Sequence, residues 1–247
     1  MLISDYLAQY KDAIRILPRD RTLKRDDLLT EDFLMSRSGK IEVYYAPHNE
    51  YLNPNAKVMI IGLTPGFTQM KIAVREAQSA LEAGLTDEEI CKKAQEAARF
   101  AGSMKMNLID MLNAIDLHQQ LNLSSCVALF HEHQLLLHTT SLLRFPVFVK
   151  KKNYSGANPN LLSNPMLREA ALTFVLEEIE MLSDTLIIPL GKTVEGVLDY
   201  LVQAGTLDAN RCLWGFPHPS GANGHRHKQF ADHQDAMRRK IQNVVKS

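Results

Sequence analysis

Two loops in this sequence combine small residues with side chains that can do chemistry. The first is residues 62–66 (GLTPG), and the second is residues 218–221 (HPSG). Small residues let a backbone approach a ligand closely, and these loops add a threonine hydroxyl and an imidazole. Each loop follows a segment that we predict to be a strand, and ligands of α/β proteins bind at the carboxyl ends of strands. The sequence therefore predicts a ligand site at these two loops.

Three other patterns suggest chemistry, but their spacing does not support it. The triplet at residues 131–133 (HEH) and the pair His225 and His227 lack HExxH spacing, and no further ligand is placed by the sequence. Residues 191–193 (GKT) are like the end of a P-loop, but the glycine that the motif needs upstream is Leu186 here. We interpret them as surface or helix-capping histidines and a strand-to-helix turn, and we expect no metal and no cofactor.

Apolar runs supply the strands that must position the two loops. Residues 57–62 and 185–191 are almost continuously apolar, which is typical of strands covered on both faces. We also predict a strand at residues 41–47, one or two within 126–149, and a last strand at 212–221 that runs into the second loop.

Helical patterns alternate with these strands. They cover residues 1–20, 69–99, 105–118, 166–182, 192–204 and 226–246. Within 69–99 the helix is interrupted at Gly84, and Thr86 with Glu89 forms a capping box that starts the next helix. The alternation predicts an α/β fold with a central, mostly parallel sheet flanked by helices on both faces. No repeat or low-complexity linker interrupts the chain, so we predict a single domain over residues 1–247.

Composition excludes several classes of protein. The 247 residues are 45% apolar, and 28 basic residues balance 28 acidic ones. Disorder and histone-like binding by bulk charge are therefore excluded, whereas a local basic face is not. The cysteines Cys91, Cys126 and Cys212 form no CxxC pair, which argues against a disulfide framework, a four-thiolate zinc site and a four-cysteine iron–sulfur cluster.

The N-terminus and the lengths of the apolar runs indicate the cellular location of the protein. Asp5 and Lys11 interrupt any apolar core of a signal peptide, and no apolar run approaches the roughly 20 residues that span a bilayer. With reduced thiols, these features lead us to expect a soluble, cytoplasmic monomer that does not bind membranes.

The pair of loops, in this order, resembles the uracil-DNA glycosylase superfamily. Members carry a GxxPG or GxxPY motif after the first buried strand and an HPS or NPS motif before the final helix. The segments VYYAP, FAGSMKMNLIDML, TTSLLR and LIIPLG are also similar to superfamily landmarks. The resemblance covers roughly residues 41–69 and 100–246, and it implies a three-layer sandwich in which residues 70–99 are a helical insertion.

The resemblance implies excision of a flipped-out base, with DNA as the partner and water as the co-substrate. His218 would stabilise the departing base anion, and Thr64 would position the water where many relatives carry Asp or Asn. Phe100 would stack on the flipped-out base, and residues 222–224 would fill the space that this base leaves between its neighbours in the DNA. The implied base contacts are Leu63, Phe67, Phe100 and Ser141; the implied DNA contacts are Gly62, Pro65, Gly66, Gln69, Arg144, Ser220, Gly221, Ala222, Asn223 and Arg226.

The distribution of charge agrees with a DNA partner. Residues 141–160 contain four basic and no acidic residues, and residues 211–247 contain seven basic residues and two acidic ones. Local charges of +4 and +5 therefore flank the two loops of a neutral protein, as duplex binding requires.

Two departures from the family pattern bear on the substrate. Thr64 is not ionisable and cannot be a general base, and Ser141 stands where uracil-excising relatives place a base-reading Asn. Smaller side chains and the helical insertion predict a bulky or modified pyrimidine, for instance a modified cytosine of phage DNA excised in antiviral defence. Lys192 lies at a strand end, but relatives do not use it, so we expect a monofunctional enzyme.

Other functions remain open at this point. The protein could be an ordinary uracil or mismatch repair glycosylase, a catalytically silent DNA-binding module with this fold, or a hydrolase of free nucleosides. The last of these would not need the basic segments.

Overall fold

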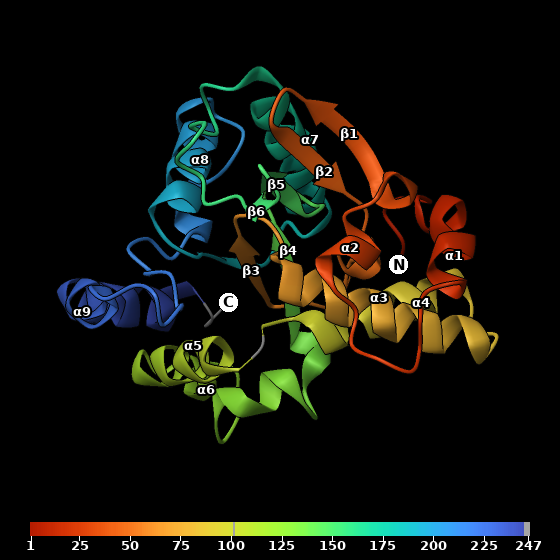
Figure 1. Ribbon diagram of the computed structural model, residues 1–247. Helices are drawn as coiled ribbons and strands as arrows, with labels where there is room; N and C mark the ends of the chain where they lie inside the picture. The colour runs from red at the N-terminus through yellow and green to blue at the C-terminus, as the bar shows by residue number, and fades with distance from the viewer. Residues whose placement is uncertain (101, 245–247) are drawn as a thin grey trace. The chain divides into compact units, whose positions relative to one another are not determined.

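The computed structural model describes residues 1–100 and 102–244, which form two compact units (Figure 1). The first unit contains Met1–Leu52, Leu63–Arg99 and Ser141–Glu178. The second contains Asn53–Gly62, Phe100–Thr140 and the described residues from Ile179 onward. Each unit is therefore assembled from three separate stretches of chain.

The second unit is built around a three-stranded sheet. Its strands are β3 (Val58–Gly62), β4 (Leu137–Ser141) and β7 (Leu186–Pro189), in the order β4-β3-β7. β3 and β7 run parallel, with Val58 opposite Leu186 and Ile61 opposite Pro189. The helices of this unit are α5 (Ser103–Ala114), α6 (Leu117–Gln120), α8 (Lys192–Gln203) and α9 (Arg226–Val244).

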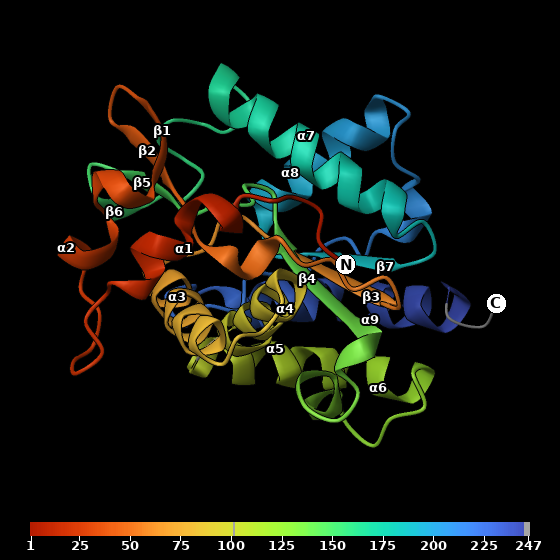
Figure 2. The same ribbon diagram turned by 90° about the vertical axis from the view of Figure 1, so that its right-hand side faces the viewer.

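Helices cover both faces of this sheet. Val58 and Ile60 pack in one core cluster with residues of α5 and α9, and the alternate residues Met59 and Ile61 are fully buried on the opposite face. Figure 2 shows α5 and α8 on opposite sides of the strands. The near-continuous apolar run of β3 is explained by this double coverage. The predicted α/β fold with helices on both faces of a parallel sheet is confirmed.

The first unit contains a second sheet, which is antiparallel. Its strands are β1 (Leu34–Ser38), β2 (Ile41–Tyr44), β5 (Val147–Val149) and β6 (Lys152–Asn153), in the order β1-β2-β5-β6. The predicted strand at residues 41–47 thus belongs to a small antiparallel sheet, because it turns back on β1 as a hairpin. The helices of this unit are α1 (Leu7–Arg15), α2 (Arg25–Leu28), α3 (Phe67–Glu82), α4 (Asp87–Ala98) and most of α7 (Pro165–Met181).

The helical stretch at residues 70–99 forms the pair α3 and α4. Ala73, Ala94 and Ala98 pack together with no exposed surface, because small side chains let the two helices approach closely. α4 begins at the predicted capping box, in which the Thr86 hydroxyl accepts from the Glu89 backbone N–H and the Glu89 carboxylate accepts from the Thr86 N–H.

Some predicted elements are corrected by the structure. Residues 212–221 do not form a strand: Cys212 makes a single parallel bridge to Ile187, and after it Gly215 is left-handed and two prolines lack the N–H that a ladder needs. The helix predicted over residues 1–20 covers only Leu7–Arg15. The prediction of one or two strands within residues 126–149 is confirmed by β4 and β5, which lie in its second half, after short 3-10 turns at residues 126–136. The last helix is described as far as Val244, so residues 245 and 246 lie outside the described part.

Candidate active site

Thr64 joins the first loop to a neighbouring segment of the first unit. Its hydroxyl donates a hydrogen bond to the Phe145 carbonyl at 3.1 Å and accepts one from the Val147 N–H at 3.0 Å. Beside it, the Leu143 N–H donates to the Leu63 carbonyl at 2.9 Å. The hydroxyl proton is thus used within the protein, and with respect to the described residues one oxygen lone pair is left to accept a hydrogen bond from water. Thr64 can hold a water molecule by accepting its hydrogen, but it cannot take up its proton.

The N-terminus of α3 is closed by side chains. The Gly66 N–H donates to the Gln69 Oε1 at 3.2 Å, and the Phe67 N–H donates to the Asn153 Oδ1 at 3.2 Å. The Gln69 amide also reaches the Ala98 carbonyl at 3.4 Å. Gly66 and Gln69 therefore cap a helix here, whereas Pro65 is buried beside them. Sequence reasoning missed Asn153, which comes from β6.

The Phe67 ring is half-buried and has a cationic neighbour. The Arg25 guanidinium lies 4.6 Å from the ring centroid and 5.6 Å from that of Phe148. This is cation–π geometry. The ring that we expected to contact a base is thus covered on one face by a residue of α2 that the sequence did not indicate.

Arg144 and Ser141 are both buried in the first unit. Arg144 is 1% exposed, and its guanidinium pairs with Glu177 at 2.8 Å and Glu178 at 3.2 Å while lying 4.4 Å from the Phe174 ring centroid. A buried guanidinium needs such acidic partners to offset its lost hydration. This placement gives Arg144 a structural ion pair instead of the exposed position that a DNA phosphate contact needs. Ser141 is 8% exposed at the end of β4.

His218 lies in the second unit with its ring orientation fixed. The Ser220 N–H donates to the His218 Nδ1 at 3.2 Å. Nδ1 is therefore the acceptor nitrogen, which assigns the proton of the neutral ring to Nε2. Burial lowers the pKa of His218 below its usual value. At neutral pH the residue is a neutral imidazole whose Nε2–H can donate a hydrogen bond.

The backbone around His218 is held by three side chains. The His218 carbonyl accepts from the Asn223 amide at 3.2 Å, the Pro219 carbonyl from the Asn107 amide at 2.9 Å, and the Ser220 carbonyl from the Arg226 guanidinium at 3.0 Å. Asn223 is itself anchored by Gln229 of α9 at 3.0 Å. The loop is therefore preorganised before any ligand binds.

These contacts separate the predicted loop residues into two kinds. Ser220, Asn223 and Arg226 are half-buried and hold the loop, and the Ser220 hydroxyl accepts from the Ala222 N–H at 3.2 Å. Gly221 and Ala222 are exposed, as a contact with DNA requires. Sequence reasoning missed Asn107 and Gln229. Asn107 lies within the segment FAGSMKMNLIDML, which resembled the superfamily, and that was the available signal.

A pocket of about 160 Å³ opens beside His218. Its polar lining comes from His218, Lys192, Glu195, Asn223, Gln229 and His233. Gly191 forms part of the wall, with a φ of 86°, and a Cβ added there would lie 3.1 Å from the His218 Cβ. Only glycine can adopt this positive φ and leave this space beside His218 without strain.

Phe100 and Gly62 also belong to the second unit. Phe100 is half-buried, has a φ of 44°, and meets the Phe130 ring edge-on with centroids 6.4 Å apart. Gly62 ends β3. The structure thus brings Leu63–Gln69, Ser141 and Arg144 into the first unit, and Gly62, Phe100 and residues 218–226 into the second.

Titratable groups elsewhere in the described residues provide neither a metal site nor an activated thiol. In the described residues, no group of three or more His, Cys, Asp or Glu side chains could hold a metal ion. Cys91, Cys126 and Cys212 are buried and unbonded to one another. Burial raises the pKa of Cys126 and of Cys212 to about 12, so these thiols are poor nucleophiles. Among the described helices, none has the length and apolar character to cross a bilayer.

Comparisons with known proteins identify the family of this chain. The family model described as "Uracil DNA glycosylase superfamily" matches residues 50–242. The chain is 40% identical to "Uncharacterized protein YoxB" of Bacillus subtilis (strain 168), over 97% of this chain and 93% of that protein. No solved structure matches. The family match indicates a hydrolase of the DNA glycosylase class that binds DNA and acts in DNA repair. The chain belongs to the uracil-DNA glycosylase superfamily.

Proposed function

We propose that this protein is a monofunctional DNA glycosylase that excises a modified pyrimidine. The target nucleotide flips out of the DNA, water adds to C1′ of its sugar, and the electrons of the N-glycosidic bond leave with the base. A proton from the attacking water ends in solvent or on the base. The product is an intact strand with an abasic site. The observation that carries the proposal is the fixed, neutral His218 in a chain of this superfamily.

His218 acts on the leaving group. Negative charge develops on the departing base, and the Nε2–H donates a hydrogen bond to a carbonyl oxygen of that base. The donor requires no reorganisation during the reaction, because Ser220, Asn223 and Asn107 already hold the loop. One such preorganised donor is worth about 3–4 kcal/mol of transition-state stabilisation.

Thr64 acts on the water. One lone pair of its oxygen has no partner among the residues that the structure describes, so it accepts a hydrogen bond from water and orients it. The oxocarbenium character of the sugar makes it electrophilic enough to need no general base.

The proposed substrate follows from Ser141 and the α3–α4 pair. A serine hydroxyl does not make the two-point contact by which an asparagine amide reads uracil. We propose a 5-substituted cytosine, such as those in phage DNA, and hence a role in defence against phage. The DNA contacts come from exposed Gly221 and Ala222, and the working form is a cytoplasmic monomer.

The class of reaction is tested on purified protein incubated with duplex DNAs of different base content. We expect strand breaks only after alkali treatment and no adduct after borohydride reduction. Direct strand scission with a trapped adduct would contradict the monofunctional assignment, and binding without abasic sites would indicate a silent DNA-binding module.

The substrate is tested on matched duplexes that contain uracil, a thymine mismatch or 5-substituted cytosines. We expect release from the substituted cytosines in preference to uracil. Strong release of uracil with none from the modified duplexes would assign the protein to ordinary uracil repair.

A further inference from the structure

The hairpin formed by β5 and β6 has a backbone that its residues do not favour. Val149 pairs with Lys152, so only Lys150 and Lys151 connect the strands, with φ values of 50° and 61°. Two positive φ values in a two-residue connection are the pattern of a type I′ turn, for which Asn-Gly is preferred. Lysine in left-handed backbone is strained. Strained backbone persists only where the surrounding structure holds it, and it clusters at functional positions.

Lys151 holds the hairpin in place. Its ammonium donates to the Tyr44 hydroxyl and to the Leu29 carbonyl at 3.3 Å, and lies 3.3 Å from the Glu42 carboxylate. Its carbonyl accepts from the Arg25 guanidinium at 3.0 Å. The charge of Lys151 is therefore used within the first unit.

Lys150 and Lys152 differ from Lys151. Both are exposed, and neither has a carboxylate within ion-pair distance in the part of the chain that the structure describes. The Lys150 N–H donates to the Lys40 carbonyl at 3.1 Å, which fixes the turn and leaves the side chain in solvent. The hairpin thus presents two ammonium groups that have no carboxylate partner among the described residues.

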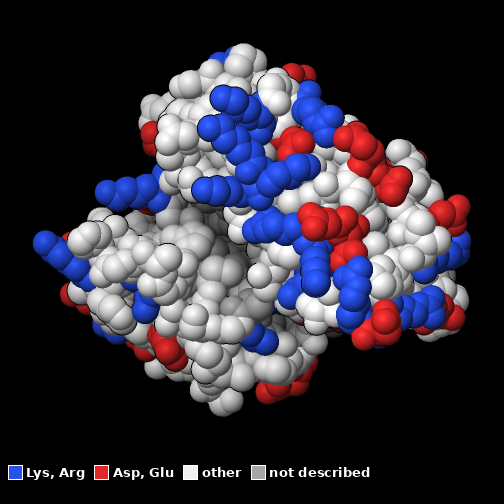
Figure 3. All heavy atoms as spheres, viewed as in Figure 1, with Lys and Arg blue, Asp and Glu red and all other residues white. Residues whose placement is uncertain are grey.

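The hairpin lies directly beside the first loop. Asn153, the residue after Lys152, accepts from the Phe67 N–H at 3.2 Å, and Arg25 bridges the hairpin to the Phe67 ring. Figure 3 shows lysine and arginine side chains gathered over β5, β6 and α2. Positive charge therefore adjoins the start of α3.

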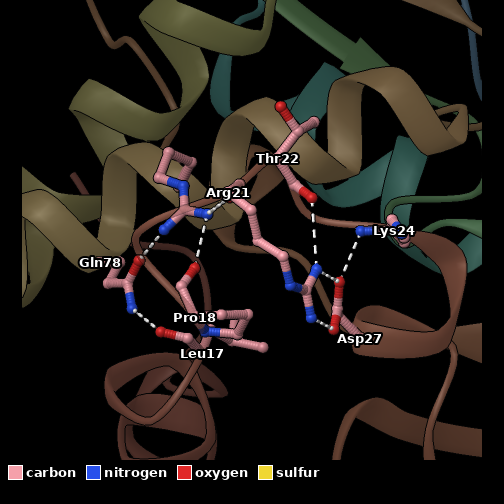
Figure 4. Close-up of polar contacts among 8 residues, drawn as sticks. Leu17, Pro18, Arg21, Thr22, Lys24, Asp27 and Gln78 are labelled. Carbon is pink, nitrogen blue, oxygen red and sulfur yellow. Dashed lines mark hydrogen bonds and ion pairs between the residues drawn. The ribbon is translucent and has the colours of Figure 1, made fainter.

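The guanidinium groups of a second cationic region of this unit already have partners within the protein. A hollow of about 520 Å³ is lined by Arg19, Arg21, Lys71 and Arg75, with Asp20 and Glu76. Arg21 forms a two-point pair with Asp27 at 2.6 and 2.7 Å (Figure 4). Arg75 donates to the carbonyls of Pro18 at 2.8 Å and Arg21 at 2.9 Å, and Arg19 pairs with Glu82. These guanidinium groups hold the loop before α2, so they are poor candidates for phosphate contacts.

We propose that the β5–β6 hairpin binds the sugar–phosphate backbone of DNA next to the first loop, with Lys150 and Lys152 each contacting a phosphate. The strained turn places both ammonium groups on the exposed edge of the sheet while Lys151 anchors it. The proposal rests on the proposed function only in taking DNA as the partner, and its readout is binding, not excision.

The salt dependence of DNA binding tests the hairpin. Binding of an undamaged, fluorescently labelled 20-base-pair duplex is measured by anisotropy between 50 and 300 mM salt. Each lost phosphate contact reduces the slope of log K against log salt by about 0.9. We expect Lys150→Ala/Lys152→Ala to reduce it by about 2, and Lys92→Ala/Lys93→Ala in α4, with the same change of charge, to leave it near the wild-type value. Equal slopes for the two double variants would overturn the proposal.

A single substitution separates binding from folding. Lys150→Asn supplies a residue that the turn prefers and removes no side-chain partner that the structure describes. We expect its melting temperature to equal or exceed that of the wild type while the salt slope falls by about 1, and Lys150→Arg to keep the slope. An unchanged slope for Lys150→Asn would also overturn the proposal. Base release is assayed separately, so hairpin-dependent binding without excision would refute the proposed function and leave the hairpin proposal standing.

Discussion

At the scale of single residues, the chemistry of the proposed site depends on which nitrogen of His218 carries the proton. The Ser220 N–H occupies Nδ1, and burial keeps the ring neutral by lowering its pKa. A neutral imidazole is a weaker donor than an imidazolium, but it requires no charge in a partly buried pocket. The residue is thereby suited to stabilise an anion that appears only during the reaction.

Removal of the imidazole should slow base release. We expect His218→Ala to reduce the single-turnover rate about 10²–10³-fold, because one preorganised donor is lost. DNA affinity should change little, since the imidazole acts on a charge absent from the ground state. Rate and affinity are measured on the same duplex, and an unchanged rate would exclude His218 as the donor.

The lowered pKa of His218 also predicts a pH profile. The ring of the folded protein stays neutral below its usual pKa of about 6.5. The rate should therefore hold as pH falls past 6.5 and decline only at the lower pKa, where a proton on Nδ1 would face the Ser220 N–H. A single-turnover profile from pH 4.5 to 8 checks this, and a rate that rises on acidification would indicate an imidazolium donor.

Gly191 sets the space next to His218. With a φ of 86° and only 3.1 Å to the His218 Cβ, Gly191→Ala should destabilise the fold by about 1–2 kcal/mol and slow base release. Gly196 of α8 is the matched control, because a Cβ there meets nothing within 4 Å. Gly196→Ala should stabilise the protein by about 0.5–1 kcal/mol. Urea unfolding of both variants measures the contrast.

At the scale of elements, side chains from one segment hold the backbone of another. Thr64 bonds to the backbone on both sides of Pro146, and Asn153 and Gln69 close the start of α3. Loops without a ladder of their own need such partners for their buried polar groups. The two functional loops are therefore ordered by polar contacts from other parts of their own unit.

The Thr64 hydroxyl can be removed without changing the shape of its side chain. Thr64→Val leaves the Val147 N–H and the Phe145 carbonyl without this partner, and should destabilise the protein by about 1–3 kcal/mol. Base release should fall less than in His218→Ala, because the hydroxyl only orients water. Thr64→Ser should restore most of both properties. A loss larger than that of His218→Ala would reverse the roles assigned to the two residues.

At the scale of the whole molecule, each unit is assembled from three separate stretches of chain. The segment Leu63–Arg99 leaves the second unit at the end of β3, and Ser141–Glu178 does so at the end of β4. The first loop (Leu63–Gly66) therefore belongs to the first unit and His218 to the second. Each unit also buries titratable groups that affect its stability.

His48 in the first unit should make folding sensitive to acid. Its ring is buried, neither ring nitrogen has a partner in the described residues, and burial lowers its pKa to about 3. In the unfolded chain His48 binds a proton near pH 6.5, whereas in the folded protein it does so only near pH 3. The free energy of unfolding is therefore highest above pH 6.5 and falls as the pH is lowered toward 3. The slope is about 1.4 kcal/mol per pH unit. In urea unfolding, the free energy of unfolding should fall less between pH 7 and pH 5 for His48→Leu than for the wild type. Equal falls in the two proteins would show that His48 does not cause the loss.

The sequence by itself determined the elements whose signal is local. The apolar runs of β3 and β7 predict buried strands, because a strand that is covered on both faces has apolar residues at successive positions. Thr86 with Glu89 predicts the start of α4, because the whole capping box lies within four residues. The GLTPG and HPSG loops, with the segments similar to superfamily landmarks, identified the family.

Only the tertiary structure decided the contacts between residues far apart in the sequence. Asn107, Asn153 and Gln229 hold the functional loops, yet a lone amide carries no periodic pattern that reveals its partner. Arg144 has the charge of a DNA contact, but Glu177 and Glu178 enclose it, and charge in a sequence does not report exposure. Local patterns fix which elements form, whereas the packing of the chain fixes which side chains meet, because polar partners are chosen by position in space.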